Sequence, residues 1–213
     1  MRKFLTALII TSAGLSASAA SAAEIYLNKD NITVEVGSNT SEGSFNNTFS
    51  GGNTIDKVID APSADASEDH TQDSHIWFTA DENGGGLELL FDFQQEYDLT
   101  TLHFWNYFTE VYDVDQIDFT FFNESNAQVG SLTVLPNLGT SPGITAQDYL
   151  LAAPLNVRFV SAFLTGSNRQ VDFQNIGFTG QLSIPVSDVP LPGALVMMLT
   201  GLAGFGAFKR KKA

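Results

Sequence analysis

The 213-residue sequence predicts an all-β protein, an antiparallel jelly-roll sandwich flanked by an N-terminal signal peptide and a C-terminal membrane-spanning helix. Three observations favour the sandwich. Apolar and polar residues alternate in several short runs, as they do in half-buried strands. Gly, Asn, Asp and Ser clusters separate these runs, and helical periodicity is weak between residues 24 and 188. Seventeen Phe residues, most of them at alternating positions, would fill the space between two sheets.

The first element in chain order is a signal peptide over residues 1–23. Basic residues at Arg2 and Lys3 precede an apolar run to Leu15, and small Ser and Ala residues follow it up to Ala23. Signal peptidase recognises this order of basic, apolar and small-residue regions. The chain is therefore expected to be exported, with a mature protein that begins near Glu24.

The strands of the sandwich are expected within residues 24–181. The run at residues 157–163 carries Val157, Phe159 and Phe163 at alternating positions, which suggests a common face. In the last run the apolar parity changes before Ile176, so a β-bulge is expected near Gln174 and Asn175. The expected strands cover residues 25–36, 76–79, 87–93, 102–107, 116–121, 128–134, 157–163 and 171–179.

A Ser/Pro linker over residues 182–188 leads to a tail of three parts, residues 189–213. The first part is the extended motif Val189, Pro190, Leu191, Pro192, Gly193 and Ala194, which its prolines keep out of regular structure. The stretch from residue 191 to residue 208 has no charge and falls within the membrane-spanning range of about 17–25 residues. A basic stop follows and would stay in the cytoplasm, namely Lys209, Arg210, Lys211 and Lys212.

This tail resembles the PEP-CTERM sorting tail of Gram-negative bacteria in its VPLPA-like variant, with Gly193 as an insertion or substitution. The resemblance implies transient anchoring in the inner membrane and cleavage by an exosortase-type membrane peptidase. It also implies release to the cell surface or the extracellular matrix, as in a biofilm. An ordinary C-terminal anchor is the alternative.

The charge of the body excludes some partners. The body contains 24 acidic residues and only four basic ones, Lys29, Lys57, Arg158 and Arg169, so the exported part carries a formal charge of −20. Such a body repels phosphate backbones, and nucleic acid is not an expected partner. The negative charge of the body would attract divalent cations, although a generally acidic secreted surface explains the charge equally well. The chain has no cysteine, so the core alone must hold the domain together.

Scattered motifs in the body resemble discoidin-like, galactose-binding-type jelly rolls. The matching segments are residues 53–56 with Trp77, residues 86–93, residues 102–107, residues 157–160 and residues 171–180. The resemblance implies binding of carbohydrate or lipid surfaces through loops at one end of the sandwich, and a structural Ca²⁺ in some members. A glutamate of the family's closing strand is replaced here by Asn175, which removes one carboxylate that often helps to bind this ion.

Two sets of candidate site residues follow from these observations. Asp56 and Asp60 lie in the loop region that supplies oxygen ligands in the family, which leaves a structural calcium open; solvated loop carboxylates are the alternative. Aromatic rings at Trp77, Trp105 and Tyr107 could stack on sugars. Packing of both tryptophans in the core is the alternative.

The sequence predicts no catalytic site. His70 and His75 flank acidic residues and could bind Zn²⁺ or Ni²⁺ in principle, but an exposed loop is the favoured interpretation. Neither a Gly-x-Ser-x-Gly nor a His-Glu-x-x-His motif occurs. We therefore expect a non-enzymatic surface or matrix protein that binds exopolysaccharide or the cell envelope. A secreted polysaccharide hydrolase with a carboxylate pair and a passive spacer are the alternatives.

Overall fold

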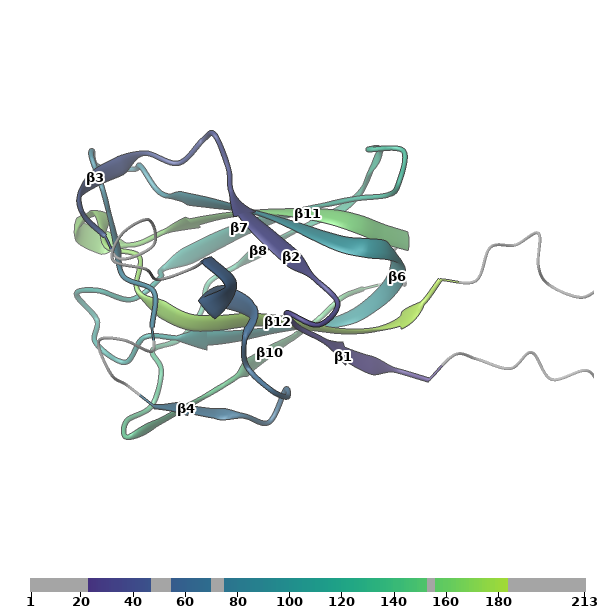
Figure 1. Ribbon diagram of the computed structural model, residues 1–213. Helices are drawn as coiled ribbons and strands as arrows, with labels where there is room; N and C mark the ends of the chain where they lie inside the picture. Colours follow the sequence, from purple (N-terminus) through teal and green to yellow (C-terminus); the bar gives the residue numbers. More distant parts are fainter. Residues whose placement is uncertain (1–22, 47–54, 70–74, 153–155, 184–213) are drawn as a thin grey trace, which may run out of the picture. The chain divides into compact units, whose positions relative to one another are not determined.

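The computed structural model describes residues 23–46, 55–69, 75–152 and 156–183 (Figure 1). The sorting tail, His70 and nearly all of the expected signal peptide lie outside the described residues. Within the described part of the chain, no helix is both long enough and apolar enough to cross a membrane.

The predicted all-β fold is confirmed, because the described residues form strands that pair antiparallel and only two short 3-10 helices. The expected runs at residues 87–93 and 102–107 belong to one long strand. The sequence pattern does not predict β3, β4, β9 and β10. The elements are β1 (Ile25–Leu27), β2 (Thr33–Val36), β3 (Glu42–Asn46), η1 (Ile55–Ile59), β4 (Ser67–Asp69), β5 (Phe78–Ala80), β6 (Leu87–Asn106), β7 (Gln116–Phe122), β8 (Gln128–Val134), β9 (Gly143–Thr145), β10 (Gln147–Leu150), β11 (Asn156–Thr165), η2 (Ser167–Arg169) and β12 (Phe173–Leu182).

Strand β6 belongs to both layers of the sandwich. Its first half pairs with β2 on one side and β11 on the other, and β7 and β8 continue this first sheet. Its second half pairs with β10 and β12, and β1 continues this second sheet. Between the halves, Gln94 adopts a φ of 64°, in the left-handed region. One hydrogen-bonded strand therefore bends from one sheet into the other.

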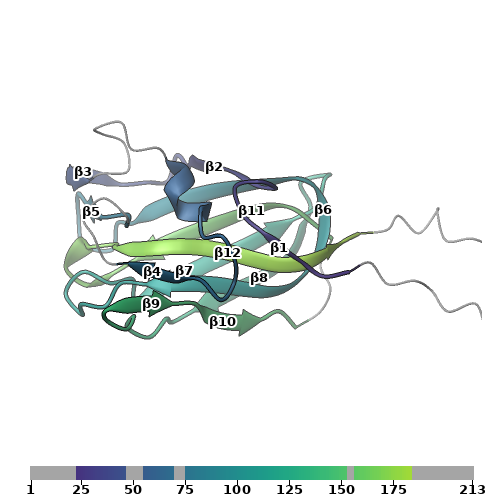
Figure 2. The same ribbon diagram turned by 60° about the horizontal axis from the view of Figure 1, so that its bottom comes forward.

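The main core lies between the two sheets. The Phe178 ring of β12 packs edge-on against Phe91 and Phe93 of β6, with centroid distances of 5.7 Å and 5.1 Å. Helix η1 contributes buried Val58 and Ile59 to the same core and packs against β12 and β2 (Figure 2). The many phenylalanines of the sequence thus fill the inter-sheet space, as expected from their alternation.

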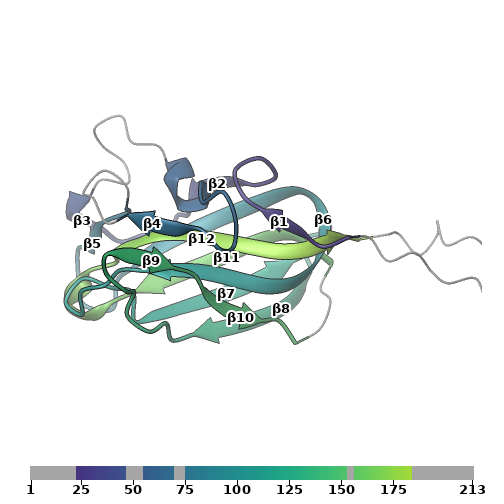
Figure 3. The same cartoon turned by 90° about the horizontal axis from the view of Figure 1, so that it is seen from below.

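A third, smaller layer covers the outer face of the second sheet. β4 pairs with β9 as a separate two-stranded ribbon, which lies in front of the second sheet in Figure 3. Ile144 of β9 and Ala61 form a second apolar cluster with Trp105 of β6. The outer face of β6 is therefore buried at this position.

Two sequence-based expectations about strand faces have different outcomes. The bulge in β12 is confirmed, because its register with β6 shifts between Phe173 and Asn175. The expectation that Val157, Phe159 and Phe163 share one face is wrong. The β11–β6 register shifts between Val157 and Phe159, so Val160 occupies the core while Phe159 and Phe163 face outward and are half-buried. One irregular pairing thus moves two aromatic rings to the solvent side of the first sheet.

Candidate functional site

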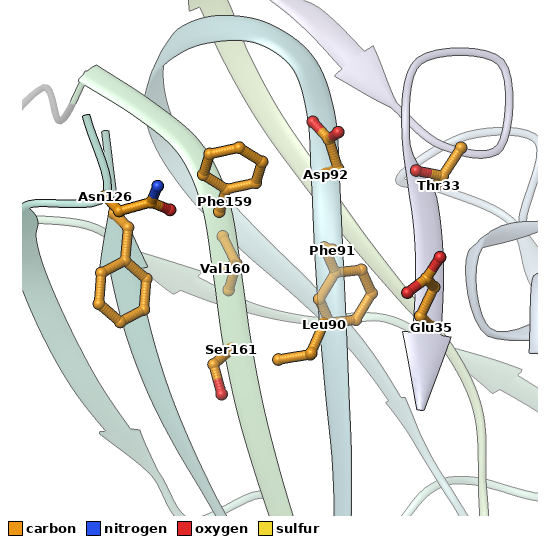
Figure 4. A pocket seen from close by; sticks show the side chains of 10 residues that line it. Thr33, Glu35, Leu90, Phe91, Asp92, Asn126, Phe159, Val160 and Ser161 are labelled. Atoms are coloured by element: carbon orange, nitrogen blue, oxygen red, sulfur yellow. The ribbon is translucent and has the colours of Figure 1, made fainter. Parts of the chain in front are cut away.

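The outer face of the first sheet carries a hollow of about 460 Å³ (Figure 4). This volume lies within the range of roughly 300–1,000 Å³ that is typical of small-molecule sites. We call it the sheet-face hollow. Its lining comes from β2, β6, β7, β11 and the turn after β7, and consists of Thr33, Glu35, Leu90, Phe91, Asp92, Phe122, Asn126, Phe159, Val160 and Ser161.

Strand register arranges the lining in two rows that cross the sheet. In the first row Thr33 lies opposite Asp92, Asp92 opposite Phe159, and Phe159 opposite Phe122. In the second row Glu35, Leu90 and Ser161 lie opposite one another in turn. Side chains opposite each other on one face are close neighbours. The hollow therefore places two half-buried aromatic rings and an exposed Leu90 beside carboxylate, hydroxyl and amide groups.

An ion pair fixes one side of the hollow. Arg158 pairs with Asp92, with 2.7 Å between Nε and Oδ1, and its Nη2 donates a hydrogen bond to Oδ2 at 3.3 Å. The guanidinium carbon of Arg158 also lies 5.3 Å from the centroid of the Phe159 ring, a cation–π distance. The pair and the stacking together hold Asp92 and Phe159 in place.

A buried carboxylate anchors the loop beside the second row. Glu88 is 8 % exposed, and its Oε2 accepts a hydrogen bond from the Asn39 backbone N–H at 2.9 Å. Its Oε1 accepts from Asn39 Nδ2 at 3.0 Å and from the Ser161 hydroxyl at 3.2 Å. A Cβ at Gly37 would lie 2.1 Å from this carboxylate, which explains why a glycine stands there. The loop is thereby tied to the sheet next to Ser161.

The aromatic residues predicted as sugar contacts are mostly enclosed. Trp105 is completely buried and its indole N–H donates to the Ala66 carbonyl at 2.9 Å, so core packing, the alternative reading of this residue, holds. Tyr107 is 8 % exposed and stacks on His75, with 5.0 Å between ring centroids. Only Trp77 of the three is half-buried rather than enclosed. Trp105 therefore presents no exposed ring face on which a ligand could stack.

His75 corrects the expectation of an exposed histidine loop. It is 4 % exposed, and its Nε2 lies 4.0 Å from Oδ2 of the buried Asp172. Asp113 is also buried and forms an isolated bridge with Asp172. Burial raises the pKa of Asp172 to about 8. The hydrogen bond from the Phe78 backbone N–H lowers this pKa, and repulsion from Asp113 adds a smaller rise. His75, Asp113 and Asp172 therefore bring three segments of the chain together.

Burial is also the main cause that raises the pKa of Asp113, to about 6. Asp115 and Glu110 add repulsion, whereas hydrogen bonding to Asn106 lowers the pKa. Two neighbouring buried carboxyl groups therefore bind protons more tightly than ordinary aspartates do.

The calcium ligands expected from the resemblance do not come together as a site. Asp56 lies in the first turn of η1 and Asp60 directly after it, and both are exposed. Burial, Asp60 and Asp69 raise the pKa of Glu68, so these carboxyl groups share one region. Even so, the described part of the chain contains no group of three or more His, Asp or Glu residues that could hold a metal ion. Ca²⁺ takes six to eight oxygens, and Asp56 and Asp60 alone do not supply this number.

Hydrogen bonds hold the loop around Ala61, next to the carboxylates expected to bind calcium. The Asn175 Oδ1 accepts from the Ala61 backbone N–H at 3.0 Å, and Asn28 Nδ2 donates to the Ala61 carbonyl at 3.1 Å. The Lys29 N–H donates to the Ile59 carbonyl at 2.9 Å. Asn175, which stands at the family's glutamate position, thus binds the loop backbone directly.

One chain of hydrogen bonds has the order of a catalytic triad. His103 Nδ1 lies 2.7 Å from Asp148 Oδ1, and its Nε2 lies 2.7 Å from the Thr179 hydroxyl. His103 is 4 % exposed, and the rings of Tyr26 and Trp105 lie beside it. The three residues come from β10, β6 and β12, which are neighbours in the second sheet. We interpret these hydrogen bonds between Asp148, His103 and Thr179 as a cross-link between the three strands.

The fold resembles solved jelly-roll domains. An F5/8 type C domain from Bacteroides fragilis aligns with a TM-score of 0.51 and 10 % identity, over 75 % of this chain and 98 % of that domain. The family 32 carbohydrate-binding module of Clostridium perfringens NanJ, solved with galactose, aligns with a TM-score of 0.45 and 10 % identity over 74 % of this chain and 99 % of the module. A family 62 carbohydrate-binding module from Clostridium thermocellum aligns with a TM-score of 0.43 and 20 % identity, over 71 % of this chain and 96 % of the module.

No protein-family model matches the sequence, and no curated protein matches it significantly. The likeness to the F5/8 type C domain therefore supports the discoidin-like jelly roll at the level of the fold.

Proposed function

We propose that the body is a non-enzymatic module that binds carbohydrate through the sheet-face hollow. The observation that carries the proposal is the placement of the Phe159 and Phe122 rings beside a carboxylate, an amide and hydroxyl groups in one hollow. The C–H face of a pyranose packs on an aromatic ring, while its hydroxyl groups need hydrogen-bonding partners at the edges. The hollow offers both, and the discoidin-like fold agrees with such a role.

Binding should depend on Phe159. Replacing Phe159 by Ala is expected to weaken the binding of soluble oligosaccharides about tenfold or more, because loss of a central aromatic anchor costs about 1.4 kcal/mol of binding free energy or more. The free energy of unfolding should fall by only about 1 kcal/mol, since the ring is half-buried. Isothermal titration against an oligosaccharide panel, with denaturant unfolding alongside, measures both effects.

Phe163 provides the matched control. It lies on the same strand and the same face, is also half-buried, and does not line the hollow. Phe163→Ala should lose similar stability and keep binding. If Phe159→Ala binds normally while Trp77→Ala does not, the loops around residues 56–75 are the binding site. New reducing ends in the polysaccharide would indicate a hydrolase, and no binding at all a spacer.

We further propose that the chain is exported and sorted to the cell surface or matrix. The sequence order of signal peptide, extended Val189–Ala194 motif, apolar segment and basic stop supports this route. Signal peptidase and an exosortase-type membrane peptidase would be the processing partners.

Cleavage in the tail is the expected outcome of this route. Mass spectrometry of the surface-released protein should find a C-terminus between residues 190 and 194 and no peptide with Lys209–Lys212. Mutating Pro190 and Pro192 to Ala should leave the protein in the membrane fraction. Recovery of the intact C-terminus from the outer surface contradicts the proposal and favours an ordinary anchor.

A further inference from the structure

The charged groups around the sheet-face hollow are mostly acidic. Glu35, Glu88, Asp92 and Asp118 lie on the solvent side of the first sheet, and Arg158 is the basic residue beside them. Three of the four carboxylates already have partners. Asp92 pairs with Arg158, Glu88 binds Asn39 and Ser161, and Asp118 accepts from the Thr133 hydroxyl at 2.6 Å.

Glu35 differs from these carboxylates. It lies on the exposed side of β2, lines the hollow, and has no ion-pair partner within the part of the chain that the structure describes. Its nearest neighbour across the sheet is Leu90, which is 40 % exposed. Glu35 thus offers a free negative charge next to an apolar surface, a combination that suits a cationic group carried on a ring.

The position of Glu35 relative to Phe159 sets the size of the ligand. The two residues lie two strands apart and two residues apart along the strands. With strand spacings near 4.8 Å and about 3.4 Å per residue, their Cα atoms are about 12 Å apart. A single pyranose ring is too short for this span. A sugar stacked on Phe159 and a cationic group at Glu35 therefore belong to neighbouring units of one chain.

We infer that the hollow takes a stretch of a polysaccharide whose sugars carry free, protonated amino groups. The inference rests on the proposed function, that this hollow binds carbohydrate, and adds the class of the sugar. The formal charge of −20 on the body attracts a polycation toward the domain and repels chains of uronic acids or sulfated sugars. Glu35 supplies the local contact, and Phe159 supplies the stacking surface.

The test compares oligomers of matched length: glucosamine, N-acetylglucosamine and a uronic acid. At a mildly acidic pH, where the amine is protonated, the glucosamine oligomer should bind several times more tightly than the acetylated one. This preference should shrink at high salt, because screening weakens exposed charge pairs. The uronic acid oligomer should not bind. A lysine-rich peptide of similar charge serves as a fourth ligand.

The variant Glu35→Gln measures how much the negative charge of Glu35 contributes to binding. It should weaken glucosamine oligomer binding about two- to fivefold, the range of an exposed ion pair. Binding of the acetylated oligomer should weaken less, because the amide still offers a hydrogen-bonding partner and this ligand has no charge to lose. Glu82→Gln is the control, because it removes the same charge from an exposed residue that does not line the hollow. Phe159→Ala should weaken binding of both sugar oligomers.

The outcomes separate the inference from the proposed function. If the wild-type domain binds none of the oligomers, carbohydrate binding itself fails. If it binds the acetylated and free-amine oligomers equally, carbohydrate binding stands and the amino-sugar inference is overturned. It is also overturned if the lysine-rich peptide binds as tightly as the glucosamine oligomer and is insensitive to Phe159→Ala, because charge alone would then explain the attraction.

Discussion

Replacing Trp105 by Ala is expected to lower the free energy of unfolding by about 3–5 kcal/mol, the usual effect of emptying a fully buried aromatic site. Trp105 is 0 % exposed and packs against Ala61 and Ile144 beneath the β4–β9 ribbon. The substitution also leaves the Ala66 carbonyl without its indole donor. Urea unfolding followed by circular dichroism measures the loss, which is large enough to unfold much of the domain.

Two further variants separate core packing from ligand binding. Trp105→Phe keeps most of the apolar volume and should recover much of the lost stability. Trp77→Ala should cost less than Trp105→Ala, because the Trp77 side chain is only half-buried. A folded Trp105→Ala domain of nearly normal stability that had lost its ligand would show instead that the indole contacts the sugar.

Trp105 also shows what strand periodicity can and cannot predict. Trp105 directly follows Phe104, so alternation along the strand places it on the opposite, outer face of β6, away from the main core. The sequence cannot show that a third layer covers this face. β4 and β9 are only three residues each and pair across more than seventy positions of sequence. Pairings this distant leave no local period to detect.

The sheet-face hollow also depends on strand pairings that the sequence does not reveal. Alternation predicts strands at β7, β8 and the first half of β6, and these are confirmed. Phe159, however, reaches the outer face only because the β11–β6 register shifts beside it. The rows that join it to Asp92 and Thr33 depend on pairings between distant strands. The local sequence, with Arg158 before Phe159 and Val160 after it, is equally typical of a core strand.

The buried carboxyl groups predict an unusual dependence of stability on pH. The pKa of Asp172 is raised from 3.8 in the unfolded chain to about 8 in the folded domain. Between these values the unfolded chain releases a proton that the folded domain retains, so the free energy of unfolding falls as the pH rises. Each pH unit in this window costs about 1.4 kcal/mol per proton, which gives up to about 4 kcal/mol between pH 5 and pH 8. Asp113, with a pKa of about 6, changes stability in the same direction over the lower part of this window.

Asp172→Asn should remove most of this dependence. The amide oxygen can still accept the hydrogen bond that Asp172 Oδ1 receives from the Phe78 N–H at 3.4 Å, but the side chain no longer releases a proton. The variant should therefore match the wild type near pH 5 and exceed it in stability at pH 8.5, where the wild-type domain must hold charged carboxylates beside each other. Asp65→Asn, at an exposed position, should leave the difference between the two pH values unchanged. Thermal unfolding across pH 5–9 distinguishes the outcomes: a wild-type domain whose stability does not fall as the pH rises through this range would mean that Asp172 is already ionised in the folded state, which would contradict its raised pKa.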